Sequence, residues 1–189
     1  AILYITEQYK KNPAITTVTH RNFNRIDNFS AFLTASPAVG SWHPQLTVGV
    51  QKQWAKIEHN GETLQMDTPL FFCTLNNGIQ LPYHWTLSTD INFQSKGDYQ
   101  NIYMYQNVFM MNATLTKSFL NEHLSIHLQG IDLTHGRKDG NRIYNKHMNM
   151  DVANVSDSRE LRFTIRYKFN TAKSKYKGKG AATEEIKRL

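Results

Sequence analysis

The chain has 189 residues, a net charge of +7 and one cysteine, so it is long enough for a single domain and forms no internal disulfide. Its mean hydropathy of −0.54 and the shortness of its apolar runs exclude transmembrane helices, which need about 20 consecutive apolar residues each. These values are compatible with a transmembrane β-barrel, because lipid-facing and lumen-facing residues alternate along its strands and give a polar average.

Hydrophobic and polar residues alternate along most of the chain, which indicates β-strands. Residues 81–94 show the pattern clearly, with Leu81, Trp85 and Ile91 on one face. Several runs reach the roughly 9–11 residues that a tilted membrane-spanning strand needs, whereas strands in soluble proteins average about 5–6 residues. We predict nine antiparallel strands, at residues 1–9, 14–22, 27–36, 42–56, 69–76, 79–95, 99–117, 123–133 and 159–169.

The connections between these strands fall into two alternating groups. We expect short turns at residues 10–13, 36–41, 76–78 and 118–122, and generally longer or more polar connections at 57–68, 95–98 and 134–158, with a tight one at 23–26. Short periplasmic turns and longer extracellular loops are typical of outer-membrane barrels. We therefore expect the loops 57–68 and 134–158 to sample a ligand outside the cell, the second with a hairpin around residues 143–152.

The predicted strand number bears on the domain organisation. Nine strands place their two ends on opposite sides of the membrane, whereas complete single-chain bacterial barrels have an even number of strands. We therefore expect an all-β, antiparallel transmembrane β-barrel of which this chain is the C-terminal portion, with the barrel strands in residues 1–170. Residues 171–189 form a basic tail, with six Lys or Arg against two Glu (+4), which we place in the periplasm. A solvated terminus explains this tail better than a nucleic-acid site does, so no nucleic-acid partner is expected.

Aromatic residues lie near several predicted strand ends. In a barrel they would form interfacial girdles, because an amphipathic ring is well accommodated at the level of the lipid headgroups. The residues that we assign to the girdles are Trp42, Trp54, Tyr83, Trp85, Tyr99, Tyr103 and Tyr105. In a soluble sheet the same residues would be ordinary core aromatics.

The last part of the chain resembles a known family. The segment 157–170 (DSRELRFTIRYKFN) is similar to the closing strand of the Bacteroidetes outer membrane protein beta-barrel family, and so is the tail 175–189. The segment Gly130-Ile131-Asp132-Leu133 resembles the end of that family's penultimate strand, and His20-Arg21-Asn22 resembles an earlier strand end. These proteins are similar to TonB-dependent receptors, which import nutrients such as glycans, siderophores or cobalamin through a plugged barrel of about 22 strands. No plug domain or TonB box is recognised within these residues.

The resemblance implies a pore wall for TonB-dependent nutrient uptake in the bacterial outer membrane. Outer-membrane lipid would surround the wall, and TonB and a surface lipoprotein would be partners of the parent protein. The C-terminal strand also resembles the signal by which the barrel assembly machinery recognises its substrates, with the signal residues Phe163, Ile165, Tyr167 and Phe169. In most such proteins the aromatic residue is the last one, whereas here residues 170–189 follow it.

Two alternatives stay open at this point: a non-transporting outer-membrane barrel (an adhesin, a porin or an assembly partner) and a soluble all-β binding module. No catalysis and no cofactor are expected, because no motif indicates a nucleophile, a base and an orienting group in mutual reach. His123 and His127 share one face of a predicted strand, but a metal site would need further ligands, so no metal is predicted.

Overall fold

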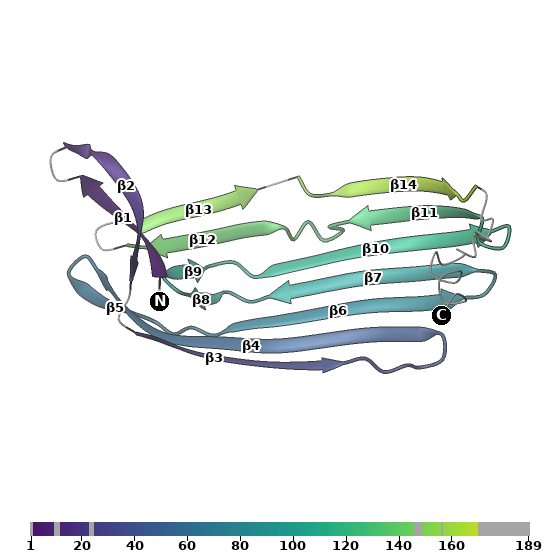
Figure 1. The fold of residues 1–189 in the computed structure, drawn as a ribbon, viewed down its shortest axis with the longest axis horizontal. Helices are drawn as coiled ribbons and strands as arrows, with labels where there is room; N and C mark the ends of the chain where they lie inside the picture. Colours follow the sequence, from purple (N-terminus) through teal and green to yellow (C-terminus); the bar gives the residue numbers. More distant parts are fainter. Residues whose placement is uncertain (1, 10–11, 23–24, 146–148, 156, 170–189) are drawn as a thin grey trace, which may run out of the picture.

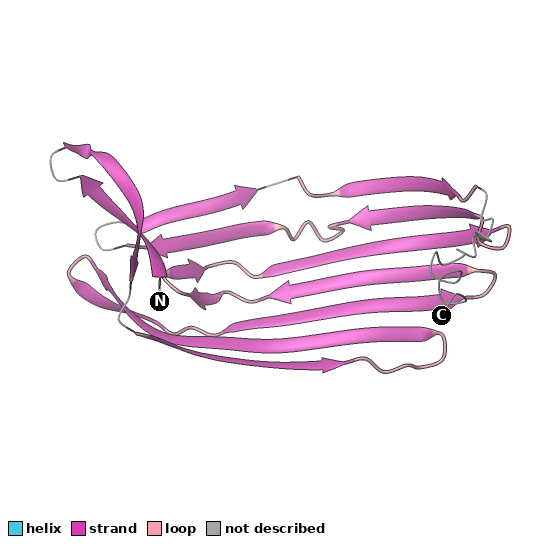
Figure 2. Ribbon diagram, in the orientation of Figure 1, coloured by secondary structure: helices cyan, strands magenta, loops and turns pink. Residues whose placement is uncertain are grey.

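The computed structural model describes residues 2–9, 12–22, 25–145, 149–155 and 157–169, and this part of the chain contains strands and no helix (Figures 1 and 2). Every strand pair is antiparallel, so the prediction of an all-β antiparallel fold is confirmed. In chain order the strands are β1 (Ile2–Tyr9), β2 (Asn12–Asn22), β3 (Ile26–Ala35), β4 (Trp42–His59), β5 (Glu62–Met66), β6 (Leu70–Leu81), β7 (Trp85–Gln94), β8 (Gly97–Tyr99), β9 (Ile102–Met104), β10 (Val108–Phe119), β11 (Leu124–Ile131), β12 (Lys138–Tyr144), β13 (Asn149–Val155) and β14 (Glu160–Tyr167). Within the described residues, no helix is long and apolar enough to cross a membrane.

Seven long strands form the main sheet, in the order β14-β11-β10-β7-β6-β4-β3, and β5 pairs with the outer part of β4. Three short hairpins are inserted between the long strands: β4 turns back into β5, β8 pairs with β9, and β12 pairs with β13. In Figure 1 the tight turns β3–β4, β6–β7 and β10–β11 lie together at the right, and the inserted hairpins lie at the left. The predicted division into a short-turn end and a loop end is therefore present, and so is the predicted hairpin in residues 134–158.

One predicted turn is wrong. Residues 76–78 lie inside β6, and the chain reverses instead after Pro82, where Tyr83 and His84 adopt φ angles of 59° and 60°. The reason is that β6 is paired on both sides at this point: Gly78 lies opposite His43 on β4 and Ser88 on β7. The predicted strands 69–76 and 79–95 are thus β6 and β7 with their boundary displaced.

Two other predicted segments are subdivided in the structure. The predicted strand 99–117 consists of the β8–β9 hairpin, which turns at Gln100 (φ 57°), followed by β10. The predicted loop 57–68 is largely strand, because β4 continues to His59 and β5 returns through the left-handed pair Asn60 and Gly61. Both errors concern the loop end, where the strands leave the regular alternation of the main sheet.

The number of strands in the main sheet also differs from the prediction. Nine long strands are present as predicted, but β1 and β2 pair with each other in a separate two-stranded sheet, so seven belong to the main sheet. The period-two alternation of the sequence is weak in this part of the chain, where the apolar residues Ile2 and Leu3 are adjacent. A strand without a distinct apolar face has a poorly specified pairing partner. The predicted tail, residues 171–189, lies outside the described residues.

A glycine on β4 fixes the spacing of two aromatic rings. Gly49 lies between Phe32 on β3 and Phe72 on β6, whose rings stack over it with centroids 5.6 Å apart. A Cβ atom at position 49 would lie 2.6 Å from Phe32 Cδ1 and 2.8 Å from Phe72 Cδ2. An aromatic ring that covers a glycine in a strand compensates for the missing side chain and helps to fix the register.

We expect Gly49→Ala to lower the free energy of unfolding by about 1–2 kcal/mol, because the added methyl group would force both rings out of their positions. Gly78→Ala is the matched control, since the nearest atom to its added Cβ is the His43 carbonyl oxygen at 3.9 Å. Reversible urea unfolding in detergent micelles measures both variants. Equal stability of the two variants would show that the stacked rings are not constrained by Gly49.

Candidate functional site

The main sheet separates its side chains into an apolar face and a polar face. Residues directly opposite each other on antiparallel strands share a face, so the register defines rows across the sheet. One row across six strands is entirely apolar: Trp42, Ile79, Leu87, Leu115, Leu128 and Phe163. The next row, on the opposite face, is His43, Gly78, Ser88, Thr114, Gln129 and Arg162.

No other part of the described chain covers the apolar face. Phe71 and Phe109, on the inner strands β6 and β10, are 51% and 47% exposed, and Phe163 on β14 is 62% exposed. The buried hydrophobic residues of the described chain are Ala55, Ile57, Met66 and Leu70, all near the loop end. An exposed apolar surface of this extent requires an apolar partner outside the chain.

Tryptophans bound the apolar face at both ends. Trp42 and Trp85 begin β4 and β7 at the short-turn end, while Trp54 lies towards the loop end of β4. With a rise of about 3.3 Å per residue and the strand tilt near 40° that is usual in barrels, Trp42 and Trp54 would be separated by roughly 30 Å along a barrel axis. This height approximates the hydrocarbon thickness of a membrane.

The other predicted girdle residues occupy different places. Tyr83 lies in the β6–β7 turn and is 83% exposed, and Tyr99 on β8 is also exposed. Tyr103 packs against the hydrophobic cluster at the loop end, and the Tyr105 ring lies where a Cβ of Gly140 would be. The structure brings Trp42 and Trp85 to the same end of the apolar face, and the assignment of all seven residues to lipid interfaces stays a prediction.

The polar face carries mainly hydroxyl, amide and charged side chains, and the stacked rings of Phe32 and Phe72 also lie on it. Thr34 and Thr47 lie 3.1 Å apart (Oγ1 to Oγ1), and the Thr74 hydroxyl donates to Asn92 Oδ1 at 3.2 Å. The His127 ring nitrogens contact the hydroxyls of Thr116 and Ser125 at 3.0 and 2.9 Å. This face suits an aqueous lumen, since its groups bond to one another and have the donors and acceptors that water needs.

At the loop end, the inserted hairpins pack together on β4. Ala55, Ile57 and Met66 form a small hydrophobic cluster, against which Tyr103 and Tyr144 pack. The buried Gln53 side chain joins β4 to the β8–β9 turn, because its amide donates to the Gln100 carbonyl at 2.7 Å and its Oε1 accepts from the Gln100 N–H at 2.6 Å. The Asn101 side chain likewise donates to the Tyr144 carbonyl at 3.0 Å. The loops are thus held as an ordered platform.

Asp132 fastens the longest insertion. Its buried carboxylate accepts hydrogen bonds from the N–H groups of Gly136 at 2.7 Å and Arg137 at 3.2 Å and from the Ser158 hydroxyl, just before β14. Burial opposes ionisation of this carboxyl, but these hydrogen bonds and the nearby His135 outweigh it and lower its pKa. Asp132 therefore closes the base of the β12–β13 hairpin as an ionised group.

The pKa of Asp98, on β8, is shifted in the opposite direction to that of Asp132. Burial raises its pKa and the Asp67 carboxylate adds to this effect, although the Thr68 N–H donates to Asp98 Oδ2 at 2.8 Å. The hydrogen bonds that Asp98 and Asp132 accept come from loop backbone N–H groups and from hydroxyl groups. Their roles are to position the loops.

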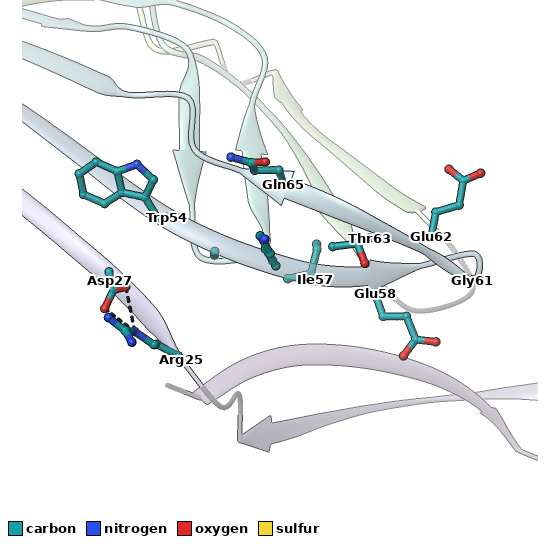
Figure 3. A pocket seen from close by; sticks show the side chains of 11 residues that line it. Arg25, Asp27, Trp54, Ile57, Glu58, Gly61, Glu62, Thr63 and Gln65 are labelled. Atoms are coloured by element: carbon teal, nitrogen blue, oxygen red, sulfur yellow. Dashed lines mark hydrogen bonds and ion pairs between the residues drawn. The ribbon is translucent and has the colours of Figure 1, made fainter.

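A hollow of about 890 Å³ opens beside the loop end of β3, β4 and β5 (Figure 3). On one side of it the Arg25 Nε–H donates to both carboxylate oxygens of Asp27, at 3.0 and 2.9 Å, and Trp54 and Glu62 also line it. The lining mixes cations, carboxylates and an indole ring. This lining is more typical of a surface in the polar layer above a membrane than of an enclosed site for a small molecule.

The described residues contain no group of three or more His, Cys, Asp or Glu side chains placed to hold a metal ion. His127 uses its ring nitrogens for Thr116 and Ser125, as described above, and His123 lies before β11, with its Nδ1 3.5 Å from the Lys168 carbonyl oxygen. The sequence pattern places both histidines on one face of a predicted strand, but in the structure they have different hydrogen-bond neighbours.

The residues of the predicted assembly signal lie on or just after the edge strand β14. Phe163, Ile165 and Tyr167 project from its apolar face, and the Phe169 ring meets the Tyr167 ring edge-on with centroids 4.6 Å apart. Within the described residues, β14 pairs only with β11, so its other edge carries unpaired backbone groups.

Sequence reasoning missed the polar residues that organise the loops, Gln53, Asp98 and Asn101. No local signal marks them, because their partners come from distant segments. It also missed the position of Lys117 on the apolar face. A signal was available, since Lys117 interrupts the alternation of apolar residues in Leu115 and Phe119.

Comparison with known proteins gives one match. A model of the outer membrane protein beta-barrel family matches residues 2–167, which includes all of the main sheet. No curated protein and no solved structure matches the chain.

Proposed function

Because the chain belongs to the outer membrane protein beta-barrel family and therefore lies in the bacterial outer membrane, we propose that it forms part of the wall of a TonB-dependent nutrient transporter. The observation that carries this proposal is the open sheet with one apolar and one polar face. The apolar face contacts lipid, and the polar face lines a lumen. The sequence resemblance to TonB-dependent receptors supplies the transport role.

The open edges support a barrel larger than this sheet. Within the described residues, β3 and β14 are each paired on one side only. Lipid offers no hydrogen bonds to backbone groups, so strands that span a membrane must belong to a closed sheet. Further strands must therefore complete the wall, as in transporters whose wide barrel holds a plug.

The loop platform supports a role in capturing ligand. The inserted hairpins lie at the end opposite the short turns, which is the extracellular end in barrels of this kind. Their hydrophobic cluster and buried polar contacts order the loops, so a ligand or a surface lipoprotein would meet a formed surface. We propose no catalysis and no cofactor. The Ser158 hydroxyl, at the base of the longest insertion, donates its hydrogen bond to the Asp132 carboxylate.

The conductance of the full-length protein in a planar bilayer tests the transport proposal. A plugged transporter should give no steady ion current and should bind the periplasmic domain of TonB. A permanently open channel with no affinity for TonB would contradict the proposal and favour a porin. Neither result would alter the assignment to the outer membrane.

We also propose that β14 is the strand that the barrel assembly machinery recognises. Its free edge can pair with another strand, and its aromatic residues are exposed. Replacing both Phe163 and Tyr167 by Ala should reduce the amount of folded protein in the outer membrane several-fold, measured as the heat-modifiable band on a gel. The matched control replaces both Arg162 and Arg166 by Ala, because these two residues project from the opposite face of β14. An equal reduction in both variants would contradict recognition through the aromatic face.

A further inference from the structure

Two lysines interrupt the apolar face, one towards each end. From the Trp54 row to the Trp85 row, the apolar face carries two cations within the described residues, Lys52 and Lys117, and one carboxylate, Asp27, which lies opposite Trp54. Each lysine lies over a tryptophan ring, with Nζ 5.3 Å from the Trp54 centroid for Lys52 and 5.1 Å from the Trp85 centroid for Lys117. A cation on the lipid side of a barrel is strongly destabilising at the midplane and tolerated near the interfaces.

Lys117 is held in a defined position. It lies directly opposite Trp85 on the neighbouring strand, and its Nζ is also 5.4 Å from the Phe119 ring centroid. The ammonium donates a hydrogen bond to the Tyr83 carbonyl oxygen, which occupies one of its three N–H groups. Among the described residues, no carboxylate forms an ion pair with Lys117. The cation is thus fixed by aromatic rings and a neutral carbonyl.

The position of Lys117 corresponds to the headgroup layer of the periplasmic leaflet. It lies at the short-turn end, in the row that contains Trp85, and Phe119 and Tyr167 follow one row further out on β10 and β14. A hollow of about 450 Å³ adjoins this end of β10 and is lined by Phe119, Ser118, His84 and Glu122 among others, and a headgroup phosphate beside Lys117 would lie nearer to that lysine than to the Glu122 carboxylate. A headgroup beside Lys117 would therefore have space towards the periplasm.

We propose that Lys117, positioned by Trp85, Phe119 and the Tyr83 carbonyl, binds the phosphate of a phospholipid in the periplasmic leaflet. Lys52, at the other end, contacts one aromatic ring, that of Trp54, whereas Lys117 contacts the rings of Trp85 and Phe119. The proposal rests on the membrane location of the sheet and is independent of TonB-dependent transport.

Native mass spectrometry of the full-length protein in detergent tests this site. The protein is titrated with phosphatidylethanolamine, and with diacylglycerol that has the same acyl chains but no phosphate. We expect Lys117→Gln to weaken binding of the phospholipid about five-fold and to leave binding of diacylglycerol unchanged. Lys168→Gln is the matched control, because Lys168 is an exposed lysine just after β14 that does not stack on Trp85. The Lys168→Gln variant should bind phospholipid like the unaltered protein.

Two results would overturn the proposal. One is phospholipid binding by Lys117→Gln that equals binding by the unaltered protein. The other is binding of diacylglycerol by the unaltered protein as strongly as phospholipid, which would show that the phosphate is not recognised. The second comparison needs no variant, so it decides the question even if Lys117→Gln fails to fold.

Discussion

Leu75→Arg is expected to lower the free energy of unfolding by about 2–4 kcal/mol, the cost of an arginine at the midplane of the lipid-facing side of a barrel. Leu75 lies near the middle of β6, opposite Leu46 on β4 and Ile91 on β7, so its row is apolar on both sides. The guanidinium at this depth would be far from both headgroup layers. Reversible urea unfolding in lipid vesicles gives the free energy directly.

Asn76→Arg is the matched control, one residue further along the same strand. Asn76 projects from the polar face and lies opposite Gln45 and Asp90, so an arginine there would meet water and a carboxylate. We expect its unfolding free energy to stay close to that of the unaltered protein. If Leu75→Arg and Asn76→Arg destabilised the protein equally, the assignment of the two faces to lipid and lumen would be wrong.

Asp132→Ala should open the base of the β12–β13 insertion, with a loss of about 3 kcal/mol in the local opening free energy. The variant removes the acceptor of four hydrogen bonds, the weakest being that from the Thr134 hydroxyl at 3.5 Å, and leaves the Gly136 and Arg137 N–H groups without their carboxylate partner. Each hydrogen bond to a charged group contributes about 1.5–3 kcal/mol, part of which is offset because the buried carboxylate no longer has to be desolvated. Hydrogen–deuterium exchange of peptides covering residues 132–144 measures the opening.

The control for this prediction is Asp151→Ala on the neighbouring strand β13. Asp151 also makes a two-pronged contact, with Arg142 at 2.6 and 2.8 Å, but it is exposed. Exposed ion pairs contribute little to stability. The exchange of the insertion in Asp151→Ala should therefore stay close to that of the unaltered protein, and faster exchange than in Asp132→Ala would contradict the role of Asp132.

The lowered pKa of Asp132 predicts the pH dependence of the same insertion. Because the folded pKa lies below that of the unfolded chain, about 4, ionised Asp132 contributes its full stabilisation above that value. The contribution is lost as the pH falls through the folded pKa. Limited proteolysis should show faster cleavage within 134–158 below about pH 4, and Asp132→Asn should remove most of this acid sensitivity. An unchanged acid response in Asp132→Asn would assign the effect to another group.

The sequence is sufficient for predicting the long strands, because alternation is a local property of each segment. It is insufficient for the turns, as the two Asn-Gly pairs illustrate. Asn60-Gly61 forms the β4–β5 turn, whereas Asn77-Gly78 lies inside β6. The same dipeptide has different outcomes because Gly78 is paired on both sides and the Asn77 amide bonds to Thr89 at 3.0 Å, which are tertiary contacts.

The candidate site was predictable to a similar extent. The positions of Trp42 and Trp85 near strand ends could be read from the sequence, and the structure places both at the same end of the apolar face, whereas the girdle assignment stays a prediction. The cluster around Lys117 was not predictable, since it depends on the register that sets Trp85 opposite Lys117. The role of Asp132 was also hidden, although its segment carries a family resemblance, because its hydrogen-bond donors come from positions 136, 137 and 158.

The contact between the apolar face and acyl chains is tested most directly with a spin label at Cys73. Cys73 lies on the apolar face, opposite Val48 and Phe93, and Thr74 lies on the polar face. In lipid vesicles, a label at Cys73 should be relaxed strongly by oxygen and weakly by a water-soluble nickel complex. A label at position 74, in Thr74→Cys with Cys73→Ser, should show the reverse. Ready access of the nickel complex to Cys73, together with its exclusion from position 74, would contradict the account.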